Sequence, residues 1–279
     1  MNHIFIITDG QRPDWLRNDP RVSIVDHTEI IPKELLPTFS SNTIELFLHK
    51  VPGLSEHFLF ANDDFFFGRP VSPDFFFTQD GKPIVIVEDY ARPRAVFAKG
   101  GAALRKGEDL NMKMQSNAQK YAFDKTGIRF HCRFKHAFEP MRKSYLAENI
   151  ESDREMWIAT TAGTFRRESA IMRLAYPLLD FGRGRNVLVR KYSRRNGARI
   201  AFDPKENPAI ARAVMAVGGV LGLRKSIIDS RRRGIIRQLR KQEPEAFCLN
   251  YIGARGEKYR ARAMSFLSEM FPKKSRYEK

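Results

Sequence analysis

The chain has 279 residues, of which 42% are hydrophobic and 11% aromatic, so it can bury a substantial core and is not disordered in bulk. With 49 Lys and Arg against 32 Asp and Glu, the net charge is +17, which favours anionic partners: nucleic acid, an anionic membrane surface, or substrates that carry phosphate. No apolar run approaches the roughly 20 residues that span a bilayer. MNHIFIITDG lacks the features of a secretory signal, and the two cysteines form no disulfide framework. We therefore expect a cytoplasmic protein, with the inner face of the membrane as one place of action.

The first hundred residues alternate short apolar runs with polar loops. The run IFIIT ends at Asp9-Gly10 and VSIV ends at Asp26-His27, as buried strands do where they meet a polar loop. The turn PTFSSN carries helix-capping residues and precedes a stretch with helical spacing. This rhythm predicts an α/β fold with a mainly parallel sheet flanked by helices. The expected strands are 4–8, 22–25, 58–61 and 83–88, and the expected helix is 43–51.

The chain beyond residue 100 is predicted to be mostly helical. The stretch 180–199 is rich in glycine and arginine and fits no element, and 223–242 has the pattern of a basic amphipathic helix. We find no linker that forces two domains, so 1–279 is expected to be one catalytic domain with sections 1–100, 101–185 and 186–279. The other expected helices are 107–123, 144–157, 168–179 and 256–271, with a short strand at 246–250.

Acidic and amide side chains follow the predicted strands. In open α/β sheets, ligands bind outside the carboxyl ends of the strands. Asp9, Asp26, Asp63-Asp64 and Asn250 each stand at such a place, and Asn62 precedes the aspartate pair. Carboxylate and amide oxygens suit Mg²⁺ or Mn²⁺ bound to substrate phosphates. The alternative for Asn62-Asp63-Asp64 is an ordinary turn or helix cap.

Several basic and titratable residues are further candidates. His49 stands four residues after Glu45 on the predicted helix, so the two share a face, either as an acid–base pair or, as we favour, as a simple i,i+4 contact. His136 stands among cations, which favours the neutral base form, or else it is an exposed loop residue. Arg166 and Arg167 precede a predicted helix and are either phosphate-binding or surface arginines.

In this order, these segments resemble the Stealth family of sugar-1-phosphate transferases. Residues 3–68 carry TDGQ, DHTEIIP, LPTFSSNTIE, HKVPGLSE and NDD, and they resemble nearly the whole second characteristic region of the family. KHAFEPMRKS and TFRRES are similar to parts of its third region. FCLN resembles the start of its fourth region, although Tyr251 stands where the family has aspartate, and FLSEMFPKKSRYEK resembles the usual ending.

The resemblance implies a set of site residues. It implies catalytic roles for Glu45, Asp64, His136 and Arg166. Asp63 and Asp64 are the expected metal ligands, for Mg²⁺ or Mn²⁺. The residues expected to bind substrate are Asp9, Gln11, Asn42, His49, Asn62, Asp63, Arg142 and Asn250.

The resemblance also implies a reaction. The expected activity is transfer of hexose-1-phosphate from a UDP-sugar to a hydroxyl of a glycan acceptor, including lipid-linked ones, with release of UMP, as in capsular polysaccharide synthesis. In this expectation His136 is the general base, Arg166 neutralises the phosphoryl charge, Asp64 binds a cation or orients the donor, and Glu45 orients the sugar or His49.

Alternatives to this activity remain open. One is a glycosyltransferase that releases UDP. Another is a non-catalytic remnant, or a basic protein that binds glycan or a membrane surface through residues 224–241; no nucleic-acid motif is present. The family's first region, with a TWVDGSD-like motif, has no counterpart here, so we expect either a start upstream of Met1 or a shortened homologue.

Overall fold

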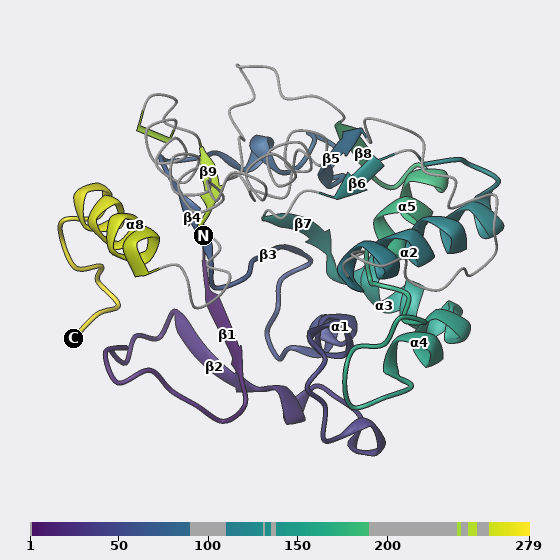
Figure 1. The fold of residues 1–279 in the computed structure, drawn as a ribbon, viewed down its shortest axis with the longest axis horizontal. Coiled ribbons are helices and arrows are strands. Elements are labelled where there is room, and N and C mark those ends of the chain that lie inside the picture. Colours follow the sequence, from purple (N-terminus) through teal and green to yellow (C-terminus); the bar gives the residue numbers. More distant parts are fainter. Residues whose placement is uncertain are drawn as a thin grey trace, which may run out of the picture.

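The computed structural model describes residues 2–89, 110–130, 132–134, 138–189, 239–240, 245–249 and 257–279 (Figure 1). The strands in this part of the chain are β1 (Ile4–Thr8), β2 (Val22–Asp26), β3 (His57–Phe60), β4 (Phe65–Phe67), β5 (Ile84–Asp89), β6 (Cys132–Phe134), β7 (Glu139–Arg142), β8 (Val187–Val189) and β9 (Ala246–Cys248). The α-helices are α1 (Ser41–Leu46), α2 (Leu110–Thr126), α3 (Lys143–Ser152), α4 (Arg154–Thr161), α5 (Ala175–Gly182) and α8 (Glu257–Met270). Single 3₁₀ turns are η1 (His27–Glu29), η2 (Lys33–Leu35), η3 (Leu48–Lys50) and η4 (Pro73–Phe75).

The first two strands form a parallel pair. β1 and β2 run in register from Ile4 opposite Val22 to Thr8 opposite Asp26, so both end at the same edge. Asp26 then caps η1: its carboxylate accepts the backbone N–H of Thr28, and Glu29 reaches back to the backbone N–H of Asp26. This capping box explains why β2 ends there, since the free N–H groups of the next turn are satisfied locally.

The remaining strands pair in a mixed way. β3 pairs antiparallel with β7, β4 pairs antiparallel with β9, and β5 lies between antiparallel β6 and parallel β8. The α/β class is therefore confirmed, but a mainly parallel sheet is not, because the described strands form small separate sheets of both kinds. An apolar run identifies a strand, whereas its partner is set by chain segments that lie far away in the sequence.

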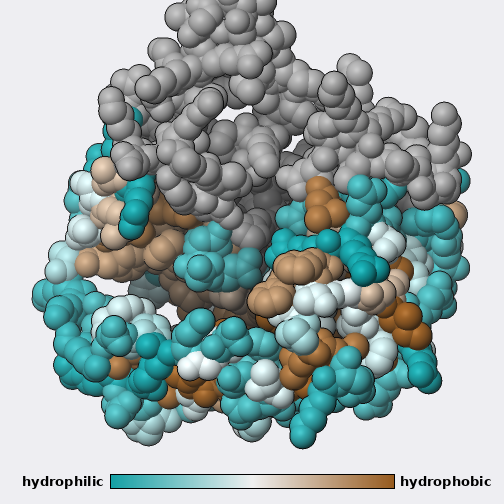
Figure 2. All heavy atoms as spheres, turned by 60° about the horizontal axis from the view of Figure 1, so that its bottom comes forward, coloured by the Kyte–Doolittle hydropathy of each residue, from teal (hydrophilic) through white to brown (hydrophobic). Residues whose placement is uncertain are grey.

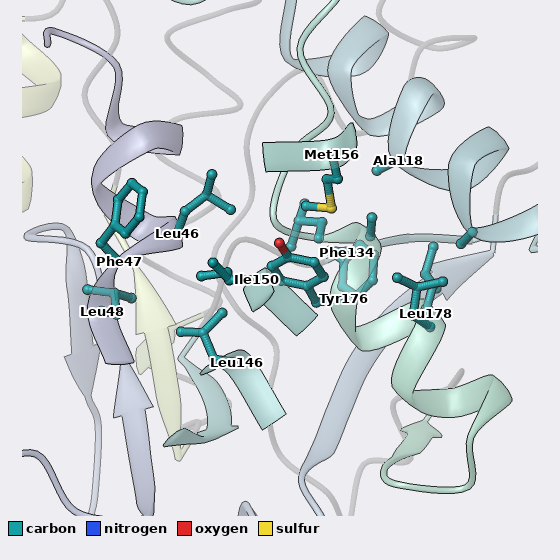
Figure 3. Packing of buried hydrophobic residues seen from close by; sticks show 14 of the residues in the cluster. Leu46, Phe47, Leu48, Ala118, Phe134, Leu146, Ile150, Met156, Tyr176 and Leu178 are labelled. Carbon is teal, nitrogen blue, oxygen red and sulfur yellow. The ribbon is translucent and has the colours of Figure 1, made fainter. Parts of the chain in front are cut away.

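The helices pack around one large hydrophobic core. Figure 3 shows Leu46 of α1 with Phe47 and Leu48 on one side, and Leu146 and Ile150 of α3 beside them. Met156, Tyr176 and Leu178 complete the packing, and Ala118 of α2 is fully buried against it. Burying each large apolar side chain contributes about 1.5–3 kcal/mol, so this cluster accounts for the folding of helices that are too short to be stable alone.

A second, smaller cluster joins the C-terminal helix to the last strand. Phe266 of α8 packs with Phe247 of β9, and Phe66 of β4 stacks on Phe247. In Figure 1 α8 accordingly lies beside β4 and β9. Figure 2 shows one face of the molecule, on which hydrophilic residues dominate and apolar residues gather in small groups between them.

Three predicted helices are shortened or divided in the structure. The predicted helix 43–51 is shorter: α1 ends at Leu46 and the 3₁₀ turn η3 follows. The predicted helix 144–157 is two helices, because the backbone of Asp153 leaves the helical region. The predicted helix 168–179 begins only at Ala175, and the unassigned stretch 180–199 contains the strand β8. Of residues 223–242, only 239–240 are described.

The described helices contain none that is both long enough and apolar enough to cross a bilayer.

Candidate active site

Glu45 stands on the short helix α1. The helix begins after Ser40, and its buried face carries Asn42 and Thr43. The side-chain amide of Asn42 donates to the sulfur of Met114 in α2, at 3.2 Å. Both Glu45 and Asn42, two of the predicted site residues, are therefore held by a helix that is itself anchored in the core. This arrangement gives the Glu45 carboxylate a defined position.

Arg173 is the central contact of Glu45. Its side chain is 1% exposed, and its Nε and one terminal nitrogen lie 3.1 and 3.0 Å from the same oxygen, Oε2, of Glu45. The other terminal nitrogen lies 2.8 Å from Oε2 of Glu139 on β7. The guanidinium also lies over the ring of Phe60, 5.0 Å from its centre. One buried cation thus joins α1, β7 and the end of β3.

Burial and the neighbouring arginines act in opposite directions on the pKa of Glu45. Burial raises the pKa of Glu45, and the charge of Glu139 adds to this effect, while Arg173 and Arg166 oppose it. No described residue donates a hydrogen bond to the second oxygen of Glu45, Oε1, and the side chain is 15% exposed. The carboxylate is thus held through one oxygen, and the other can accept a hydrogen bond from a substrate hydroxyl.

Arg166 lies beside α1. Its guanidinium donates to the hydroxyl of Ser41 at 2.5 Å, and its charge acts on Glu45. The two segments meet again one turn earlier, where the backbone N–H of Phe39 donates to the carbonyl of Thr164. The rings of Phe39 and Phe165 stack with their centres 5.2 Å apart, and both are largely exposed, 65% and 66%. The structure therefore brings LPTFSSN and TFRRES together.

The aspartate pair lies where three distant segments meet. Asp63 is exposed, while the carboxylate of Asp64 accepts the S–H of Cys248 at 3.2 Å, and its carbonyl accepts the backbone N–H of Leu249. Immediately after the pair, β4 forms its ladder with β9. NDD and FCLN are thus neighbours, although Asp64 and Cys248 are 184 residues apart in the sequence.

Phe138 brings the third region to the same place. Its ring stacks on Phe67 at 4.1 Å and contacts Phe65 at 5.5 Å. The next residue is Glu139, which binds Arg173 and pairs with Phe60 just before the NDD loop. His136 lies outside the described residues, two positions before Phe138, and Asn250 lies outside them too, next to Leu249. Their predicted roles stay predictions.

Asp9 and Gln11 lie at the carboxyl edge of the β1–β2 pair. Both side chains are exposed. Asp9 is 3.8 Å from Nδ1 of His27, and the backbone of Gly10 has a positive φ of 70° with Asp26 close by. A Cβ at this position would approach Asp26 to 3.2 Å, so glycine allows the sharp turn. Asp9 and Asp26 therefore come together as expected, but β3, which leads to Asp63-Asp64, belongs to a different sheet.

His49 and Arg142 are engaged elsewhere. The prediction that His49 shares a helix face with Glu45 is wrong, because the helix ends before it and its Nδ1 contacts the carbonyl of Leu46 at 3.2 Å. Burial lowers the pKa of His49. Arg142 binds Glu56 at 2.8 Å and lies over the ring of Tyr145. It stands at the opposite end of β7 from Glu139.

The acidic side chains of the described residues bear on the expected cation site. Among them, no group of three or more His, Cys, Asp or Glu side chains is placed to hold a metal ion. Asp63 and Asp64 supply two adjacent carboxylates, and Mg²⁺ commonly binds through one or two carboxylates together with substrate phosphates. In the structure one oxygen of Asp64 accepts from Cys248, so the predicted cation at Asp63 and Asp64 stays a prediction.

Two residues of the site are missed by sequence reasoning, Arg173 and Glu139. The available signal was an arginine within the apolar stretch SAIMRLAY, since a buried cation needs buried acidic partners. Which acids these are depends on the packing of α1 against β7, and no local pattern shows it.

Comparison with known proteins finds sequence matches to a described family and to named relatives. Residues 1–85 match the family described as Stealth protein CR2, conserved region 2. The chain is 30% identical to an exopolysaccharide phosphotransferase of Streptomyces coelicolor over 286 aligned positions, which cover 100% of this chain and 43% of the relative.

Shorter matches have higher identity. The chain is 50% identical over 91 residues to the capsular polysaccharide phosphotransferase LcbA of Neisseria meningitidis, and 51% identical over 84 residues to WcwK of Streptococcus pneumoniae, also a capsular polysaccharide phosphotransferase. These matches cover 32% and 30% of this chain and 25% of each relative, so the chain spans from a quarter to less than half of the relatives it matches. Residues 1–85 therefore match conserved region 2 of the Stealth proteins, and the chain is similar to bacterial capsular and exopolysaccharide phosphotransferases.

Proposed function

We propose that this protein transfers hexose-1-phosphate from a UDP-sugar to a hydroxyl of a glycan acceptor, in the synthesis of an extracellular polysaccharide. The observation that carries the proposal is the meeting of Glu45 with Arg166 and Arg173, because Glu45 and Arg166 come from segments that match or resemble separate Stealth regions. Arg173 also lies over Phe60, two residues before the NDD loop. The names of the homologues, capsular and exopolysaccharide phosphotransferases, support the same class of reaction.

In the proposed reaction, the acceptor oxygen attacks the phosphorus that bears the sugar. A new oxygen–phosphorus bond forms, the bond from that phosphorus to the oxygen of UMP breaks, and the acceptor proton passes to His136. Arg166, exposed beside Ser41, would bind the transferring phosphoryl group and neutralise its charge. Oε1 of Glu45 would accept a hydrogen bond from a sugar hydroxyl and so orient the reacting group.

Asp63 and Asp64 would hold Mg²⁺ or Mn²⁺ together with the donor phosphates. The bound cation would neutralise phosphate charge. The buried Cys248–Asp64 contact and the β4–β9 ladder hold the loop in place for this role. The net charge of +17 supports action at an anionic membrane surface, where lipid-linked acceptors are presented.

The identity of the nucleotide product tests the proposal. The purified protein is incubated with UDP-hexoses, Mg²⁺ or Mn²⁺ and an acceptor polysaccharide, and the products are separated by chromatography. We expect UMP and a phosphodiester-linked sugar, and loss of UMP release with excess EDTA. Release of UDP with a glycosidic product would instead identify a glycosyltransferase.

Matched variants show whether the site carries the activity. Arg166→Ala should lower UMP release at least about tenfold, because a cation on the phosphoryl group is lost in the transition state. Arg154→Ala is the control, since Arg154 is an exposed arginine at the start of α4. Equal losses in both variants would count against a role for Arg166 in the reaction.

A further inference from the structure

We propose that Arg173 is a positioning residue of the transfer site: it presents Oε1 of Glu45 to the substrate and couples Glu45 to the segment that carries His136. This inference rests on the proposed function and extends it to Arg173, a residue outside the motifs of the sequence analysis. It is a role through Glu45, because Arg173 is 1% exposed and has no surface for a substrate.

The hydrogen bonds of Arg173 hold Glu45 asymmetrically. The Nε and one terminal nitrogen both contact Oε2 of Glu45, at 3.1 and 3.0 Å, so the contact turns this oxygen inward. The opposite terminal nitrogen binds Glu139 at 2.8 Å and faces the sulfur of Met141 at 3.8 Å. Phe60 closes one face of the guanidinium. These contacts fix the planar guanidinium in one orientation. The single ammonium group of a lysine cannot make the same set of contacts.

The second carboxylate links the two halves of the site. Glu139 follows Phe138, whose ring is stacked on β4 after the NDD loop, and it stands three positions after His136 in the sequence. Glu45 comes from α1, which also holds Arg166 through Ser41. Among the described residues, Arg173 therefore connects α1 to the start of β7, so a shift of α1 would move Glu139.

A purely structural purpose does not require this arrangement. A buried ion pair is often replaceable by apolar residues without loss of stability, because desolvating the charges offsets their attraction. Here one cation is shared between two carboxylates, and Glu45 keeps an oxygen with no partner among the described residues. Such incomplete satisfaction is expected where a substrate supplies the missing hydrogen bond.

The test combines Arg173→Lys with Glu45→Asp, which keeps a carboxylate on a shorter side chain. Arg173→Lys should lower kcat about tenfold or more while the donor KM changes less than threefold, because misorientation acts in the transition state. If Arg173 acts through Glu45, the double variant is no slower than the slower single variant. A wild-type kcat for Arg173→Lys, or losses that multiply in the double variant, would overturn the proposal.

Arg185→Lys is the control, since Arg185 is a paired arginine that binds Glu148 away from α1 and should keep the wild-type kcat. Where Arg173→Lys does not fold, as judged by circular dichroism, Glu139→Gln takes its place under the same criteria. It removes one anchor of the guanidinium and keeps an acceptor oxygen.

A titration separates failure of this inference from failure of the proposed function. Carboxyl-carbon NMR of Glu45 needs no turnover and compares wild type with Glu139→Gln. Removal of the Glu139 charge, which raises the pKa of Glu45, should lower that pKa. If the wild type releases no UMP but Glu139→Gln lowers the pKa of Glu45, the coupling of Glu45, Arg173 and Glu139 stands and the proposed reaction does not. If the wild type releases no UMP and the pKa of Glu45 is unchanged in Glu139→Gln, both the coupling and the reaction are refuted.

Discussion

Arg142 and Glu56 join two sequence regions that are 86 residues apart. Nε of Arg142 donates to Oε1 of Glu56 at 2.8 Å, and the same carboxylate accepts the hydroxyl and the backbone N–H of Ser144. Hydrogen bonds from Ser144 and Arg142 outweigh the effect of burial and lower the pKa of Glu56. The PGLSE motif is thereby attached to the start of α3, at the end of the β3–β7 ladder.

This contact predicts a stability effect with little effect on substrate binding. Arg142→Ala and Glu56→Ala should each lower the free energy of unfolding by about 1 kcal/mol, since both groups are partly exposed. In a double-mutant cycle measured by urea unfolding, the two losses should be less than additive. A large rise in donor KM for Arg142→Ala, with unchanged stability, would instead favour the substrate-binding role expected from the sequence.

The hydrogen bond from Arg166 to Ser41 predicts a graded effect on turnover. Ser41→Ala removes the acceptor and leaves the Arg166 charge, so UMP release should fall by about two- to fivefold, less than in Arg166→Ala. The measurement is initial-rate kinetics at saturating donor. Ser41→Thr keeps a hydroxyl and serves as the control. Equal loss in Ser41→Ala and Ser41→Thr would mean that the hydrogen bond is not the cause.

Phe138 predicts coupling between packing and activity. Its ring stacks on Phe67 and contacts Phe65, so Phe138→Ala should lower the free energy of unfolding by about 2–3 kcal/mol. Because the same residue anchors the segment that follows His136, kcat should fall more than the fraction of folded protein does. Phe138→Leu should recover much of both losses, as judged by thermal unfolding and UMP release at a temperature well below Tm. If Phe138→Leu recovers stability but not activity, packing by Phe138 does not by itself explain the loss of kcat.

Asp180 predicts a pH-dependent contribution to stability. Burial raises the pKa of Asp180 to about 6, and the amide of Asn149 and the nearby Arg185 and Arg183 only partly offset it. In the unfolded chain a carboxyl titrates near about 3.9. Since the folded-state pKa is higher, the folded protein binds this proton more tightly. The contribution of Asp180 is therefore most favourable below about pH 4 and is lost as the pH rises to about 6.

The comparison with Asp180→Asn isolates this contribution. Urea unfolding of the wild type and the variant is measured at about pH 4 and about pH 7, and the wild-type advantage should shrink by up to about 3 kcal/mol between them. Asn149 donates to both carboxylate oxygens, so the variant also loses one hydrogen bond at both pH values. A pH-independent difference between the two proteins would show that Asp180 does not titrate in this range.

Much of the site was accessible from the sequence because its parts are local signals. The segment that precedes Asn62 is the apolar run FLFA, and Ser40 and Ser41 are helix-starting residues before Glu45. The resemblance then assigned Glu45 and Arg166, which the structure places beside one another through Ser41. Such features depend on residues within about one helical turn, so a linear pattern contains them.

The sequence by itself determined the α/β class, the strands predicted at 4–8 and 22–25, and the family match of the first 85 residues. Only the tertiary structure decided that β3 pairs with β7, that the NDD loop meets Cys248, and that Arg173 binds Glu45 and Glu139. The physical reason is the range of the interactions. Hydrophobic periodicity and capping act between neighbours in the chain, whereas a buried cation selects its acids from whatever the packed core brings within hydrogen-bonding distance.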